Sequence, residues 1–313
     1  MKKTKKNTII LLSALLTLCF SACERFQGDV QVPAYLHLDR VNIVPQSQNA
    51  PSVEPGFYTA NIDAVQIIYY FEGDPSEYSL GVFQLPFTVP LLRHGNITRL
   101  TIVPVIKQNG IAGTRIAYPY YNTVKLENIR VAPDSITNIG RLDPQNNQWY
   151  INANYKTGDL IHIQTEDYFE PTAFSSNFDS TVIWVKNDPD NACTGQGYGR
   201  IHINDSTTVT TFSILKELSP DPKSVLYLEM DYKNDFEIFV NMVGFPVSSS
   251  GQVETKSIQK LHPRSNWNKI YINLGRVWEQ FNHNTPLSIF FQVTNPDHKT
   301  GDIFIDNVKI IAI

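Results

Sequence analysis

The chain has 313 residues, of which 42% are hydrophobic and 18% charged, and its formal net charge is −4. This is enough apolar material for one large or two medium-sized domains, and we expect two. An acidic chain without clusters of lysine and arginine excludes nucleic acid as a partner and offers no polybasic patch for anionic lipid.

The first 22 residues have the order of a secretory signal. Four lysines among the first six residues precede an apolar run over residues 9–20, and the small pair Ser21-Ala22 follows. At about 12 residues the apolar run is too short to span a bilayer as a helix, which takes about 20. We therefore expect residues 1–22 to be removed on export. The mature chain would then carry 22 basic against 30 acidic residues, a formal charge of −8.

The residues at the expected cleavage site carry a first resemblance. The stretch Phe20-Ser21-Ala22-Cys23 is similar to the bacterial lipobox, in which the last residue becomes the lipidated N-terminus. A chance cysteine at a plain cleavage site is the alternative. The resemblance implies acyl chains on Cys23, which contribute about 0.8 kcal/mol per buried CH₂ to membrane binding, and a short tether over residues 23–34.

The cysteine count agrees with this anchor. Cys19 leaves with the leader and Cys23 is acylated, so that Cys193 has no partner for an intramolecular disulfide. No histidine is near Cys193 in the sequence, and we expect a buried or loop thiol there and not a nucleophile.

Alternation with a period of two dominates the rest of the chain. β-Branched and aromatic runs, such as residues 64–71 and 225–234, are separated by Gly, Pro, Asn and Asp, which is typical of strands and turns. Only residues 211–218 and 276–284 have helical spacing. The sequence therefore predicts an all-β fold of two β-sandwich domains, immunoglobulin-like and then jelly roll, behind the signal peptide.

The boundary between the two domains is predicted in a polar stretch that contains proline and asparagine, residues 141–148. This gives a first domain over residues 35–142 and a connecting segment over residues 143–164. The second domain then takes residues 165–313.

Residues 79–121 combine an apolar strand, a polar turn with glycine and a long alternating strand. This order resembles the PEGA-like or immunoglobulin-like domains of lipoproteins from the phylum Bacteroidota. The chain keeps ten residues of that pattern: Gly81, Pro86, Pro90, Gly95, Pro104, Gly110, Thr114, Arg115, Tyr118 and Pro119. The resemblance covers residues 35–140 and implies a small β-sandwich.

The stretch that ends this pattern contains a candidate binding surface. Arg115 with Tyr118, Tyr120 and Tyr121 could stack on a sugar or a peptide, or contact a protein, because Tyr and Arg dominate contact hot spots. The alternative is that these tyrosines fill the core of the sandwich and bring only their hydroxyl groups to its rim.

The closing strand of the second half carries a further resemblance. The sequence "DIFIDNVKII" has the form of the terminal strand in jelly rolls that are similar to carbohydrate-binding modules, where an aspartate often helps to bind structural calcium. The resemblance implies such a role for Asp306, with Asp188, Asp190 or Asn191 as further oxygen ligands. A cap on the end of the strand is the alternative role for Asp306. No other cofactor is required.

Two further sets of residues are candidates for carbohydrate chemistry. Trp184, Trp267 and Trp278 are candidate aromatic platforms for a glycan, although none is clearly exposed by its pattern. Glu229 and Asp231 are about 7 Å apart on one face of a strand, near the spacing of glycosidase carboxylates. Their apolar neighbours predict that both face solvent, and the third carboxylate of similar glucanases is missing, so we predict no catalysis.

Two functions follow from these observations. The first is a structural or accessory subunit of an envelope protein complex, such as one for outer-membrane protein assembly or transport, with membrane-protein partners. The second is a surface lipoprotein that binds a glycan for nutrient capture. Both place the protein on the outer membrane through Cys23, and we expect it at the cell surface.

Overall fold

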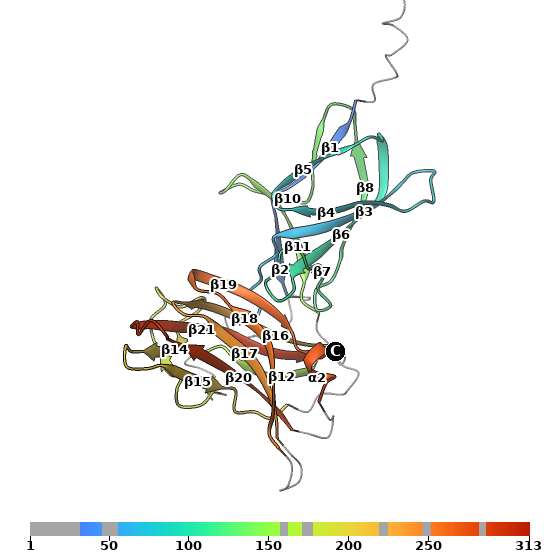
Figure 1. Ribbon diagram of the computed structural model, residues 1–313. Helices are drawn as coiled ribbons and strands as arrows, with labels where there is room; N and C mark the ends of the chain where they lie inside the picture. The colour runs from blue at the N-terminus through green and yellow to red at the C-terminus, as the bar shows by residue number, and fades with distance from the viewer. Residues whose placement is uncertain are drawn as a thin grey trace, which may run out of the picture.

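The computed structural model describes residues 32–45, 56–156, 162–170, 178–218, 225–245, 252–281 and 286–313. The signal peptide and Cys23 lie outside these residues. The described chain forms two β-sandwiches, which confirms the predicted fold class (Figure 1). Its one described helix is α2 (Gly275–Trp278). No helix in this part of the chain is long and apolar enough to cross a membrane.

The first sandwich contains β1 (Ala34–Leu38), β2 (Arg40–Val44), β3 (Ala64–Phe71), β4 (Tyr78–Gln84), β5 (Phe87–Leu91), β6 (Gly95–Lys107), β7 (Arg115–Ala117), β8 (Val124–Val131), β9 (Ile136–Asn138), β10 (Arg141–Asp143) and β11 (Gln148–Asn154). Strands β4, β3, β6, β7 and β8 form a five-stranded sheet. The other layer consists of two three-stranded sheets, β5-β1-β9 and β10-β11-β2. Because only Asp39 separates β1 from β2, the two small sheets follow one another along the chain.

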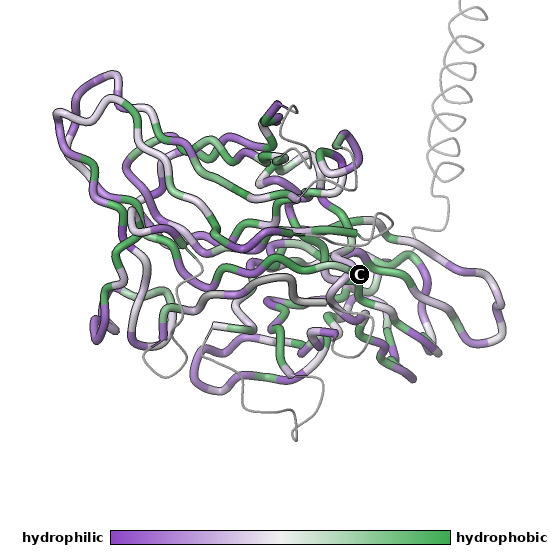
Figure 2. Tube along the Cα trace, turned by 90° about the horizontal axis from the view of Figure 1, so that it is seen from below, coloured by the Kyte–Doolittle hydropathy of each residue, from purple (hydrophilic) through white to green (hydrophobic). Residues whose placement is uncertain are grey.

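Alternation along the strands builds the core of this domain. In β5 the side chains of Phe87, Val89 and Leu91 are buried, whereas Thr88 and Pro90 are exposed. This is the period of two that places successive side chains on opposite faces of a sheet. Figure 2 shows the same change between hydrophobic and hydrophilic positions along many strands.

The predicted domain boundary needs correction. Strand β11 pairs in parallel with β2, so the first sandwich extends to Asn154, into the segment predicted as a connector (143–164). The polar stretch before β11 is the turn of the β10–β11 hairpin, where the Asp143 carboxylate accepts hydrogen bonds from the Gln145 backbone and the Asn146 side chain. The next strand, β12 (His162–Asp167), pairs with β21 of the second sandwich.

The second sandwich is antiparallel throughout its described strands, which are β12, β13 (Ile183–Val185), β14 (Tyr198–Ile203), β15 (Val209–Ser213), β16 (Leu226–Asn234), β17 (Ile238–Gly244), β18 (Glu254–Leu261), β19 (Arg264–Asn273), β20 (Leu287–Thr294) and β21 (Gly301–Ala312). One sheet has the order β13-β14-β21-β16-β19, with β12 also on β21. The other has the order β15-β20-β17-β18. A helix predicted over residues 211–218 is wrong, because this segment begins within β15.

The first domain lies on the outer face of the six-stranded sheet, above β19, β16 and β21 (Figure 1). Tyr227, Tyr271 and Ile311 of this sheet belong to the hydrophobic cluster of the first domain and not to the core of their own sandwich. Burial of apolar side chains from both domains in one cluster joins the two sandwiches.

Candidate functional site

The outer face of the six-stranded sheet is the central feature of the domain junction. On β16, Leu228 and Met230 point into the sandwich core, so Glu229 and Asp231 point outward. Glu229 is opposite Lys309 on β21, and Asp231 is opposite Lys269 on β19. The prediction that the two carboxylates face solvent is wrong: Glu229 is 0% exposed and Asp231 3%, because the first domain covers them.

Glu229 is held by groups from both domains. One of its oxygens accepts hydrogen bonds from the hydroxyl groups of Tyr118 and Tyr155, each at 2.7 Å, and the other is 3.0 Å from the Lys309 ammonium. Burial alone would raise the pKa of Glu229, but the charges of Lys309 and Lys269 and the two hydroxyls lower the pKa below its usual value. Burial lowers the pKa of Lys309 to about 8, although Glu229 opposes this shift. Glu229 is therefore a buried anion within the junction, without access to a substrate.

Aromatic side chains surround this ion pair. The rings of Tyr118 and Tyr271, one from each domain, are 4.8 Å apart in an edge-to-face arrangement. The Tyr121 and Tyr271 hydroxyls are hydrogen-bonded at 2.9 Å, and the Tyr120 hydroxyl donates to the Ile311 carbonyl at 2.9 Å. These contacts cross the junction and satisfy the polar ends of the buried rings.

The binding surface predicted from Arg115, Tyr118, Tyr120 and Tyr121 is therefore wrong for the three tyrosines, which are 0–4% exposed. They lie between the domains, and their hydroxyl groups bind within the chain. Arg115 is separate from them: its guanidinium forms an ion pair with Asp63 at 2.9 Å.

A β-bulge on β21 shapes the junction. Between Asp231 and Glu229 on β16 there is one residue, but their partners Asp306 and Lys309 on β21 are separated by two. Asn307 within the bulge has a φ of 49°, a left-handed conformation that asparagine tolerates. The first domain touches this bulge at Gly56, where a Cβ would lie 1.7 Å from the Asn307 side-chain oxygen. Only glycine fits at that contact.

The bulge also decides the role of Asp306. One oxygen of its buried carboxyl accepts the backbone N–H groups of Cys193 and Thr194, and the other accepts that of Asn307. Burial raises the pKa of Asp306 well above its usual value, as does the nearby charge of Asp231.

The calcium site predicted from Asp306, Asp188 and Asp190 is not formed as a cluster. Asp188 instead accepts hydrogen bonds from the Tyr198 hydroxyl and the Asn191 amide, and Asp190 is exposed. No group of three or more His, Cys, Asp or Glu side chains in the described ranges could hold a metal. Asp188 and Asp306 each hold the same loop, near residues 188–194, through their own hydrogen bonds, and the described residues do not bring the three carboxyl groups together as a ligand set.

The three candidate tryptophans have different environments. Trp278 is 1% exposed within the second core, so this candidate cannot serve as a platform. Trp184 is half-buried, and its indole N–H donates to the Phe169 carbonyl at 2.6 Å. Trp267 is half-buried on the outer face of β19, where its N–H donates to the Asn191 carbonyl at 3.0 Å.

A cleft of about 390 Å³ opens beside Trp267, at the edge of the first domain. The Lys233 ammonium lies 5.1 Å from the centre of the indole ring. Both domains line the cleft, with Thr59, Ala60 and Asn61 from the first and Cys193, Thr194, Asp231, Trp267, Asn268 and Lys269 from the second. It therefore combines one aromatic ring with amide and hydroxyl groups.

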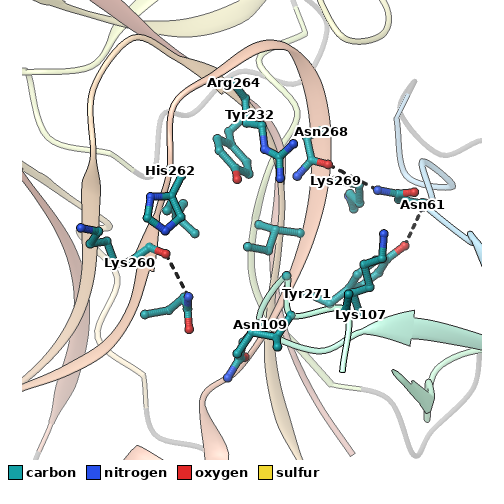
Figure 3. Close-up of a pocket in the computed structure, with 16 residues that line it drawn as sticks. Asn61, Lys107, Asn109, Tyr232, Lys260, His262, Arg264, Asn268, Lys269 and Tyr271 are labelled. Carbon is teal, nitrogen blue, oxygen red and sulfur yellow. Dashed lines mark hydrogen bonds between the residues drawn. The ribbon is translucent and has the colours of Figure 1, made fainter. Parts of the chain in front are cut away.

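A second cavity of about 390 Å³ lies on the other side of β19 (Figure 3). It shares Asn61, Asn268 and Lys269 with the Trp267 cleft, and the side chains of Asn61 and Asn268 make a hydrogen bond of 3.4 Å between the domains. Its other residues come from the end of β6 and the β6–β7 turn, from β16, and from β18, β19 and the turn between them: Lys107, Asn109, Gly110, Ile111, Ala112, Tyr232, Gln259, Lys260, Leu261, His262, Arg264, Ile270 and Tyr271. We call it the basic cavity.

Cys193 beside the Trp267 cleft is not a nucleophile. It is a free cysteine, as the count predicted, and burial raises the pKa of its thiol, as do the charges of Asp231 and Asp306. A thiol that stays protonated is a poor nucleophile.

No family model matches the chain, and no curated protein sequence matches it. Among solved structures, the chain is similar to carbohydrate-binding modules of the β-sandwich superfamily, with 13% identity over 78% of this chain and 84% of the other and a TM-score of 0.33. A family 11 carbohydrate-binding module of a Clostridium thermocellum cellulase has 15% identity over 47% and 94% of the two chains, with a TM-score of 0.30. The CBM22-1 xylan-binding domain from Paenibacillus barcinonensis has 11% identity over 50% and 98%, with a TM-score of 0.33. Likenesses at this level carry no argument about the ligand of this chain.

Proposed function

We propose that this chain is a non-catalytic glycan-binding protein that is anchored to the outer membrane by lipid. The Trp267 cleft is the observation that carries the proposal. A sugar presents a C–H face that can lie on an aromatic ring and hydroxyl groups that bind amides, and the cleft places both kinds of group around one hollow.

The position of the cleft supports binding without catalysis. Glu229 and Asp231 are the two carboxylates whose spacing is similar to that of a glycosidase pair. Both are almost completely buried and already bind lysine, tyrosine and threonine side chains. Asn61 comes from the first domain and Trp267 from the second, so a sugar in the cleft would contact both domains. Because the buried junction holds these domains together, the cleft is preorganised for a ligand.

Replacing Trp267 by alanine tests the proposal. We expect the mature protein to retain a polysaccharide in a glycan array, and Trp267→Ala to weaken that binding at least about 30-fold, or about 2 kcal/mol, which is typical of a central aromatic contact. Titration calorimetry with the retained glycan measures the change.

Trp149 supplies the matched control. It is a half-buried tryptophan on β11 and lines neither cavity. Trp149→Ala should leave the affinity unchanged. A mature protein that retains no glycan, or a Trp267→Ala variant that binds as tightly as the unaltered protein, would contradict the proposed function.

The proposed anchor rests on the lipobox-like residues before Cys23. Cells fed labelled palmitate should incorporate the label into the protein, and Cys23→Ser should abolish incorporation and release the protein from the membrane fraction, since the acyl chains supply the membrane affinity. Protease treatment of whole cells then tests exposure at the cell surface. A Cys23→Ser variant that stays in the membrane fraction would count against the anchor.

From the sequence alone, an accessory subunit of an envelope complex was the first of the two predicted functions, and glycan binding was the second. The candidate contact surface for that role was formed by Arg115, Tyr118, Tyr120 and Tyr121. The three tyrosines are buried within the chain, and Arg115 pairs with Asp63. The Trp267 cleft, in contrast, is open. Glycan binding is therefore the function we place first.

A further inference from the structure

The basic cavity differs from the Trp267 cleft in its charge. Four lysine and arginine residues line it, together with His262, but no aspartate or glutamate does. The whole chain has the opposite balance, with a formal net charge of −4. A local excess of positive charge in an acidic protein indicates a place where an anion is bound.

Most of this charge is already neutralised by carboxylates outside the lining. Lys269 is buried and pairs with Asp231 at 3.3 Å, and His262 lies 3.4 Å from Glu237. Lys260 pairs with Glu237 at 2.7 Å. Lys107 shares Asp63 with Arg115, so that one carboxylate faces two cations there.

Arg264 has no carboxylate within ion-pair distance among the described residues. It is exposed, and in Figure 3 it extends beside Tyr232 and Asn268 toward the cavity, with His262 on the facing wall. A guanidinium in such a place can bind a carboxylate or sulfate through two parallel hydrogen bonds.

The two cavities adjoin one another around the edge strand β19. Asn61, Asn268 and Lys269 line both, and Trp267 lies three residues from Arg264 on the same strand. A bulge lies between them, because Arg264 and Asn268 pair with Asn234 and Tyr232. At no more than about 3.4 Å per residue, the backbones of Trp267 and Arg264 are therefore less than about 10 Å apart, within about two sugar units along a chain. One oligosaccharide could therefore contact the indole ring and the guanidinium together.

We propose that the ligand is an acidic glycan, with a sugar in the Trp267 cleft and a carboxylate or sulfate of a nearby sugar in the basic cavity against Arg264. This inference rests on the proposed function and names the class of its ligand. It predicts a binding site with a neutral half and a charged half, separated by the Asn61–Asn268 hydrogen bond.

The test compares acidic and neutral glycans on the same protein. The acidic probes are oligogalacturonate, alginate, hyaluronan and chondroitin sulfate, and the neutral probes are xylan, dextran and β-glucan. We expect retention of at least one acidic glycan. Its carboxyl-reduced or desulfated counterpart should bind about 10- to 100-fold more weakly, which is the worth of a charge-assisted hydrogen bond.

Amino-acid substitutions then test whether Arg264 causes the preference for the acidic glycan. Arg264→Gln should weaken binding of the acidic glycan about 10-fold or more and leave the reduced counterpart within about twofold, whereas Arg264→Lys should recover part of the loss. Arg130→Gln is the matched control, because Arg130 is exposed on β8 and lines neither cavity. Trp267→Ala should weaken both forms of the glycan.

The outcomes separate this inference from the proposed function. Binding that depends on Trp267, but is restricted to neutral glycans or unaffected by Arg264→Gln, overturns the acidic ligand and leaves glycan binding in place. No binding of any probe overturns both. Acidic binding that Arg130→Gln reduces as much as Arg264→Gln does is nonspecific attraction, and it also overturns the site.

Discussion

Replacing Glu229 by glutamine is expected to lower the free energy of unfolding by about 3–5 kcal/mol, the usual cost of removing one partner from a buried ion pair. Glu229 is the carboxylate that Lys309 contacts, at 3.0 Å, and both residues are 0% exposed. The substitution would leave the Lys309 charge buried without a counter-ion. It would also exchange the anion that Tyr118 and Tyr155 share for a neutral amide.

Urea unfolding at neutral pH measures this loss. Glu254→Gln is the control, because Glu254 is exposed and its ion pair with Lys256 should contribute no more than about 1 kcal/mol. The double variant Glu229→Leu with Lys309→Met should regain much of the stability, since apolar side chains can replace a buried pair without leaving a charge. A Glu229→Gln variant that unfolds like Glu254→Gln would mean that water reaches the junction.

The fold class could be read from the sequence because alternation is a local property. Strands such as β5 show it in five residues, and their burial follows it position by position. The same reasoning placed Glu229 on the side of β16 away from Met230. Alternation could not tell that another domain covers that side, since this depends on contacts between segments more than 70 residues apart.

The first domain boundary was misplaced for a related reason. The polar residues between β10 and β11 form a hairpin turn, and a turn has the same composition as a linker. Only the pairing of β11 with β2, about 110 residues earlier, distinguishes the two. Long-range pairing of this kind leaves no local signal in one sequence.

The candidate site was foreseen in part. Trp267 was among three tryptophans that the sequence offered as platforms, and none of the three was clearly exposed by its pattern. Its cleft exists because Thr59, Ala60 and Asn61 of the first domain form the facing wall. Arg264 had no signal at all, since the basic cavity collects side chains from β6, β18 and β19.

The junction gives the cleft its walls, so stability and binding should respond together. Thr59 donates a hydrogen bond to Asp231 at 2.7 Å and accepts one from Lys269 at 2.9 Å, and all three residues line the Trp267 cleft. The ionic network between the two domains therefore continues into the proposed binding site. Loosening the junction would separate Asn61 from Trp267 and weaken a ligand that contacts both.

The stability of the protein is also expected to fall steeply above about pH 10, where tyrosine ionises in an unfolded chain. Burial, and in each case at least one neighbouring charge, raises the pKa of five junction tyrosines: Tyr118, Tyr120, Tyr121, Tyr155 and Tyr271. Above pH 10 the unfolded chain releases these protons while the folded chain keeps them, so the stability that they contribute below pH 10 is lost as the pH rises. Each such tyrosine costs about 1.4 kcal/mol per pH unit.

Lys309 acts in the opposite direction over a lower range. Its folded pKa of about 8 lies below its value in an unfolded chain, about 10.4, so between these values the unfolded state binds more protons and stability rises with pH. One lysine cannot offset five tyrosines above pH 10. Urea unfolding from pH 7 to 11 should therefore show a rise of up to about 3 kcal/mol followed by a steep fall.

Tyr118→Phe identifies the source of the fall. It removes one titrating hydroxyl and its hydrogen bond to Glu229, so this variant should be less stable at pH 7 but should lose stability with pH less steeply, by about 1.4 kcal/mol per unit. Ultraviolet absorbance of tyrosinate supplies an independent measurement, because the buried hydroxyls should ionise only together with unfolding. Ionisation of all tyrosines near pH 10 in a protein that stays folded would contradict this prediction. It would mean that water reaches the rings between the domains, against the buried contacts around Glu229.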